Sequence, residues 1–174
     1  MKKHILLLAC AIMMVMVGCH NQNGKTTQND VKKAGAELFN DDQTVNPEAA
    51  IQAVAAFSKY AQENPEASDA ADYLFKAIEI SINTKQDPQQ SIDLVNQLLG
   101  SYPEFDKNPV ALFMMASFVY DERLHDLDKA RETYQQIVDN YPDNPFAKDA
   151  AIAITQLGIP LEDLVKMFEE QNQE

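Results

Sequence analysis

The sequence predicts an all-α fold in which helical hairpins stack into a solenoid of about eight helices, with no β-sheet. Helix starts are explicit, because asparagine or aspartate followed by proline supplies an N-cap and a first helical residue. These dipeptides lie at 46–47, 87–88, 108–109 and 144–145. A repeat is also present, since Pro65, Pro103 and Pro142 are 38 and 39 residues apart. A fixed period of about 35 to 40 residues with two helices per unit is typical of helical solenoids.

The chain begins with a segment typical of an export signal. Positive charge at Lys2 and Lys3 precedes thirteen mostly apolar residues, 5–17, and the small Gly18. A helix of that length spans about 20 Å, which is shorter than the hydrocarbon core of a bilayer, about 30 Å. We therefore expect residues 1–18 to be a signal peptide and not a transmembrane helix.

The residues Met16-Val17-Gly18-Cys19 resemble the lipobox of bacterial lipoproteins. The resemblance implies cleavage before Cys19 and covalent lipid on that residue, with no other cofactor. It also implies a lipid-anchored protein of the cell outer membrane that faces the periplasm, because His20 and not aspartate follows the cysteine. Stable anchoring takes more than one acyl chain. The alternative is a plain secretory signal, although Met16 does not fit its A-x-A pattern.

The remaining chain is strongly acidic. Removal of Lys2 and Lys3 with the signal takes the formal net charge from −13 to −15. This charge excludes a general nucleic-acid binder and a polybasic membrane patch. It leaves two interpretations, a solvated acidic surface or selection for a basic partner. With Cys10 in the signal and Cys19 lipidated, we expect no disulfide and no thiolate metal site in the folded body.

Residues 20–30 are polar and lack apolar periodicity, so residues 19–30 are predicted to form a lipidated N-terminus and a flexible tether with a reach of roughly 18 Å. Residues 31–174 form the helical domain. Ser68 and Asp126 are expected to cap two more helices, and Pro160 to open the last helix after a stop at Gly158. The predicted helices cover 31–41, 47–63, 69–84, 88–101, 109–123, 127–140, 145–158 and 161–171.

Each repeat proline is preceded by the same pattern of residue sizes. A small residue lies twelve positions before it, a bulkier apolar residue eight before it, and another apolar residue five before it. The first two positions are Ala53 and Phe57 before Pro65, Ser91 and Val95 before Pro103, and Ala130 and Tyr134 before Pro142. A small residue lets paired helices approach closely, and the bulky residue fills the gap beside it.

This spacing resembles the second helix of a tetratricopeptide repeat. The best copy is 126–142, and its first helix fits with one inserted residue near Leu124 and His125. That alignment places four residues on the family's packing positions, namely Phe113, Ala116, Ser117 and Tyr120. The resemblance covers about 31–158, and it implies a stack of helical hairpins that binds other proteins.

No residue set for catalysis is visible. His125 is the only histidine expected in the folded body, and one histidine without a partner makes neither a metal site nor a base–nucleophile pair. The chain has no glycine-rich phosphate loop and no G-x-S-x-G motif. The adjacent pairs at 41–42 and 169–170 are interpreted as solvated carboxylates. We therefore expect a protein without catalytic or metal-binding residues.

The segment 110–120 is apolar nearly all round, so it is either buried on both sides or presents one face to a partner. In tetratricopeptide proteins the first helices line a concave groove that holds a peptide. The resemblance therefore implies a partner-binding groove at Ala111, Met114 and Phe118, where methionine suits adaptable contacts. The partner would be another envelope protein or peptide.

The last predicted helix, 161–171, carries Leu161, Leu164, Val165 and Phe168 on one stripe. Capping of the last solenoid face is the main interpretation, and a partner-binding tail is the alternative. The expected function is a non-enzymatic adaptor in cell-envelope assembly or maintenance, similar to envelope tetratricopeptide lipoproteins of the barrel-assembly and Tol–Pal coordinator type. A lipoprotein that captures a nutrient or other ligand is the alternative, although the chain has no tryptophan for an aromatic platform.

Overall fold

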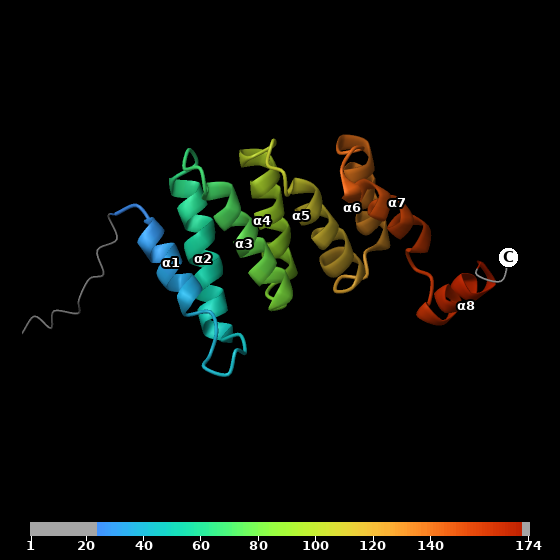
Figure 1. Ribbon diagram of the computed structural model, residues 1–174, viewed down its shortest axis with the longest axis horizontal. Coiled ribbons are helices and arrows are strands. Elements are labelled where there is room, and N and C mark those ends of the chain that lie inside the picture. Colours follow the sequence, from blue (N-terminus) through green and yellow to red (C-terminus); the bar gives the residue numbers. More distant parts are fainter. Residues whose placement is uncertain (1–23, 172–174) are drawn as a thin grey trace, which may run out of the picture.

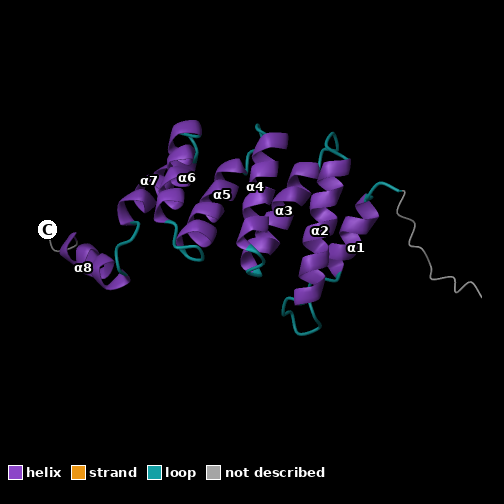
Figure 2. Cartoon of the chain, turned by 180° about the vertical axis from the view of Figure 1, so that it is seen from behind, coloured by secondary structure: helices purple, strands orange, loops and turns teal. Residues whose placement is uncertain are grey.

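A computed structural model describes residues 24–171 and shows helices stacked side by side along one axis (Figure 1). The elements are α1 (Gln28–Ala36), α2 (Pro47–Glu63), α3 (Ala70–Asn83), α4 (Pro88–Ser101), α5 (Asn108–Met114), the π-helix η1 (Met115–Asp121), α6 (Leu127–Asn140), α7 (Pro145–Gln156) and α8 (Leu161–Gln171). Within the described residues there is no strand, and a single isolated bridge joins Phe39 and Val45 (Figure 2). The all-α solenoid is therefore confirmed. The predicted signal peptide and Cys19 lie outside the described residues.

Four helix starts follow from caps that lie next to them in the sequence. Asn46 accepts hydrogen bonds from the backbone N–H groups of Glu48 and Ala49, at 3.0 and 3.1 Å. Asp87, Asp126 and Asn144 cap α4, α6 and α7 in the same way. Each cap satisfies a backbone donor that the first helical turn leaves unpaired.

None of the helices between 24 and 171 is long and apolar enough to cross a membrane.

Two predicted caps are wrong. Ser68 does not cap α3, because the residue before that helix is Asp69, whose carboxylate accepts hydrogen bonds from Tyr60 at 2.8 Å and Gln28 at 2.6 Å. Asn108 does not cap α5 from outside the helix, because it is the first residue of α5. Its buried side chain instead donates to the carbonyls of Tyr102 and Pro103, at 2.8 and 3.0 Å. In both cases the side chain at the helix start, Asp69 or Asn108, forms hydrogen bonds with groups outside the helix and therefore does not cap it.

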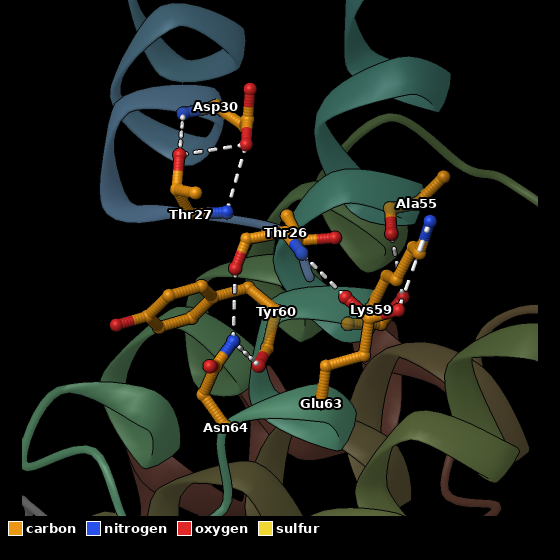
Figure 3. A network of polar contacts seen from close by, with 9 residues as sticks. Thr26, Thr27, Asp30, Ala55, Lys59, Tyr60, Glu63 and Asn64 are labelled. Carbon is orange, nitrogen blue, oxygen red and sulfur yellow. Dashed lines mark hydrogen bonds and ion pairs between the residues drawn. The ribbon is translucent and has the colours of Figure 1, made fainter. Parts of the chain in front are cut away.

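The first helix begins at Gln28 and not at 31, because Thr27 and Asp30 form a capping box (Figure 3). Just before it, the Thr26 N–H donates to the Glu63 carboxylate at 2.6 Å, and Asn64 donates to the Thr26 carbonyl at 2.9 Å. The predicted tether, 19–30, is therefore too long, because residues 26–30 belong to the folded domain. The chain enters the folded domain at Thr26, against the C-terminal end of α2.

The first helix is also shorter than predicted at its other end, since α1 stops at Ala36 and not at 41. Residues 37–46 form a loop in which the Asn46 N–H donates to the Leu38 carbonyl at 2.9 Å. Gln43 there has a φ of 66°, a left-handed conformation that a continuing helix cannot hold. The exposed Phe39 lies in this loop.

The repeat residues lie where successive helices pack. All three small residues, Ala53, Ser91 and Ala130, are completely buried. The bulkier residues Phe57, Val95 and Tyr134 are buried as well. Ser91 also shares a 2.7 Å hydrogen bond with Ser81 of α3, which satisfies two hydroxyls in a buried position. Pro65, Pro103 and Pro142 lie exposed in the turns after α2, α4 and α6, where a proline ends the helix.

The predicted helix 109–123 is present as two continuous pieces, α5 and η1. Within η1 the hydrogen bonds reach five residues back, as from the Glu122 N–H to the Ser117 carbonyl and from Leu124 to Val119, both at 3.0 Å. A π-helix accommodates an extra residue without ending the helix. The inserted residue that we expected near Leu124 and His125 is therefore absorbed mainly inside the helix.

α8 lies beyond α7, at the C-terminal end of the solenoid (Figure 1). Half-buried Leu164 of α8 shares a cleft with Phe113 and Ala153 at the end of the stack, so the cap stays a prediction. Val165 and Met167 on α8 remain 46% and 43% exposed. The chain leaves α7 through Gly158, whose φ of +78° turns it away, and a Cβ there would lie 3.0 Å from Leu127. A side chain at this position would be strained in both respects.

Candidate partner-binding surface

Two clefts open at equivalent places in the repeat. The α1–α3 cleft lies between α1 and α3, with Phe57 of α2 among its lining residues, and has a volume of about 390 Å³. The η1–α7 cleft lies between η1 and α7, with Tyr134 of α6 among its lining residues, and has a volume of about 630 Å³. Phe57 and Tyr134 both stand eight residues before a repeat proline. Each cleft is thus bounded by two first helices and by the bulky residue of the second helix between them.

The α1–α3 cleft is apolar inside and basic at its edge. The rings of Phe57 and Tyr73 lie with centroids 5.3 Å apart, and Val31 lines the opposite side. The Lys76 ammonium group lies 4.9 Å from the centroid of the Tyr73 ring, a distance at which the ring attracts a cation. Exposed Lys32 lines the same cleft from α1. Two lysines on one small surface are notable in a chain of net charge −13.

The η1–α7 cleft has a different chemistry. Phe113, Ser117 and Asp121 line it at four-residue spacing along α5 and η1. The rings of Phe113 and Tyr134 meet edge to face, with centroids 5.2 Å apart. Gln156 and Leu157 line the side of α7. This cleft therefore combines aromatic rings with hydroxyl, amide and carboxylate groups.

The electrostatics of this cleft are acidic. Burial raises the pKa of the Tyr134 hydroxyl, the hydrogen bond from Ser117 opposes that rise, and the Asp121 charge adds to it. Half-buried Asp121 itself makes no ion pair with any other described residue. His125, with a φ of 53°, also lines the cleft. The cleft thus holds a carboxylate that forms no ion pair with the part of the chain that the structure describes.

The three residues of the predicted groove differ in how deeply they are buried. Ala111 is completely buried among α4, α6 and α7, so its predicted contact with a partner is wrong. Met114 is half-buried and packs against the core. Phe118 is 42% exposed. None of the three lines either cleft, because the face that α5 and η1 turn toward the η1–α7 cleft carries Phe113, Ser117 and Asp121 instead.

We expect Phe118→Asp to lower the free energy of unfolding by only about 1 kcal/mol, because the side chain is 42% exposed. The neighbouring Val119 is completely buried, so Val119→Asp should prevent folding by placing an unpaired carboxylate in the core. Urea titrations followed by circular dichroism compare the two. The reverse order of stabilities would show that the π-helical register is wrong.

Sequence reasoning missed both clefts. A usable signal existed, because Phe57 and Tyr134 occupy the same repeat position and Phe113, Ser117 and Asp121 recur along one helix face. The sequence pattern does not give the distance between the first helices of successive units, and this distance decides whether a cleft opens between them. Among residues 24–171 no three side chains are grouped so that they could hold a metal ion. The observed arrangement is chemically suited to binding a polypeptide.

Comparison with known families identifies a tetratricopeptide repeat at residues 110–144. This segment begins inside α5 and contains η1 and α6, the best copy in the sequence. No curated protein and no solved structure matches the chain. The match supports a tetratricopeptide-like protein, and such repeats typically serve non-catalytic protein–protein interaction.

Proposed function

We propose that this protein is a non-enzymatic adaptor, anchored by lipid on Cys19 to the cell outer membrane and facing the periplasm. It binds another envelope protein through the α1–α3 and η1–α7 clefts and supports envelope assembly or maintenance. The observation that carries the proposal is the equivalence of the clefts. Each places an aromatic residue, Phe57 or Tyr134, between two first helices and beneath charged side chains.

The contacts of Thr26 support the anchoring part of the proposal. They fix the start of the domain to the end of α2, so only residues 19–25 separate the lipid from the folded chain. Fully extended, these seven residues span at most about 25 Å. A tether this short keeps the N-terminal end of the domain near the membrane and raises the local concentration of the adaptor for membrane-associated partners.

One observation favours the capture of a small ligand as a second candidate. The volume of the η1–α7 cleft, about 630 Å³, lies within the range of small-molecule sites. The two functions differ in how many clefts they need. A protein partner can contact both at once, whereas a small ligand occupies one.

Site-specific photo-crosslinking in intact envelopes tests the proposed function. A photoreactive residue replaces Lys76 at the α1–α3 cleft, Gln156 at the η1–α7 cleft, or exposed Gln136 on α6 as a control. We expect one partner protein to be crosslinked from both cleft positions and not from Gln136. Equal yields at all three positions would contradict binding at the clefts. Absence of any protein adduct would favour the small-ligand function.

A further inference from the structure

We propose that the η1–α7 cleft binds a basic and apolar segment of the partner protein, with an arginine of that segment beside Asp121. The inference rests on the proposed function and states the chemistry of its partner. Asp121 lines a cleft of about 630 Å³ and makes no ion pair within 4.0 Å with another described residue. A carboxylate held at such a surface is favoured by a cation supplied from outside.

Arginine fits the groups around Asp121 better than other side chains do. Its planar guanidinium can donate two parallel hydrogen bonds to one carboxylate and stack on an aromatic ring. Half-buried Phe113, on the same helix face as Ser117 and Asp121, supplies a ring at this cleft. The amide of Gln156 offers a further acceptor for the remaining N–H donors.

The cleft also needs an apolar neighbour for that arginine. Ala153, Leu157 and half-buried Leu164 line its other side, and the volume of about 630 Å³ exceeds what one side chain fills. An apolar residue next to the arginine would remove this surface from water. The occupant is therefore a segment in which basic and apolar residues alternate or adjoin.

The charge of the surroundings agrees with this occupant. Glu162 lies at the start of α8, two residues before Leu164, and the chain as a whole carries a net charge of −13, whereas the neighbouring Asp163 is paired with Lys166 at 3.0 Å. A field of this sign raises the association rate of a basic partner. The α1–α3 cleft carries Lys32 and Lys76 and serves as an internal control of opposite charge.

Binding of a labelled peptide to the full lipidated chain in neutral detergent tests the inference. The probe is a short acetylated and amidated peptide in which arginine alternates with leucine, and its partner probe replaces arginine with the neutral citrulline. Fluorescence anisotropy should show that the arginine peptide binds about tenfold or more tightly than the citrulline peptide. Asp121→Asn should weaken the arginine peptide by a similar factor and leave the citrulline peptide unchanged.

Two controls separate charge pairing from other effects. Glu79→Gln removes a carboxylate at the α1–α3 cleft and should leave binding unchanged. Equal circular dichroism of Asp121→Asn and the wild type excludes unfolding. Equal affinity for the arginine and citrulline peptides, or an unchanged Asp121→Asn variant, would overturn the inference. If the peptide result is negative but a photoreactive residue at Gln156 still crosslinks a partner in envelopes, the proposed function stands and only the arginine inference fails. If neither cleft position crosslinks a partner, the proposed function fails as well.

Discussion

Replacing Phe57 by alanine is expected to lower the free energy of unfolding by about 3 to 5 kcal/mol. The ring is only 4% exposed and lies where α1, α2 and α3 meet. It contacts Tyr73 with a centroid distance of 5.3 Å, and a Cβ added at Gly35 would lie 3.5 Å from it. Removing the ring leaves a cavity that the three helices cannot close without shifting toward one another.

Urea denaturation of the full chain measures this loss. Ile51→Ala is the matched control, because Ile51 lies on the same helix but is 59% exposed, and it should change stability by no more than about 0.5 kcal/mol. Phe57→Leu should fall between the two, since leucine fills part of the space. Similar losses for Phe57→Ala and Ile51→Ala would mean that the repeat residue does not hold the hairpins together.

The second large effect concerns attachment to the membrane. Cys19→Ser is expected to move the protein from the membrane fraction to the soluble fraction and to abolish its labelling by palmitate. The physical reason is that the proposed anchor consists of acyl chains, each stabilised by about 0.8 kcal/mol per buried CH₂. Within residues 24–171 no helix meets the length and apolarity that a membrane span requires.

Cys10→Ser is the control for the anchoring experiment, because Cys10 lies inside the predicted signal and should be removed with it. This variant should remain in the membrane and be labelled by palmitate. A Cys19→Ser protein that stays with the membrane would contradict lipid anchoring. A wild-type protein that is cleaved but never labelled would instead favour the plain secretory signal.

The helical repeat could be predicted because its determinants are close together in the chain. Asn46 caps α2 through the N–H groups of the next two and three residues, so the dipeptide with Pro47 is enough to locate the helix start. Local hydrogen bonds and apolar spacing carry the same information for α4, α6 and α7. For this reason the bounds of α2, α4 and α6 agree with those predicted.

Predictions of helix starts failed where a side chain or backbone group near the start forms a hydrogen bond with a residue far away in the sequence. Asp69 follows the residue that we expected to cap α3, but Gln28, 41 residues away, donates to it. The chain joins the folded domain as early as Thr26 because Glu63, 37 residues further on, accepts a hydrogen bond from the Thr26 N–H. No local pattern could report these contacts, because they depend on how α1 lies against α2.

The candidate site shows the same division between local and distant causes. Residue spacing was sufficient to establish helical hairpins with a small and a bulky residue at each crossing, because helix formation and capping act over a few neighbouring positions. The extra residue in η1, the burial of Ala111 and the clefts near Phe57 and Tyr134 emerged from the packed molecule. They depend on the separation of helices from successive units, which is set when those helices compete for the same core volume.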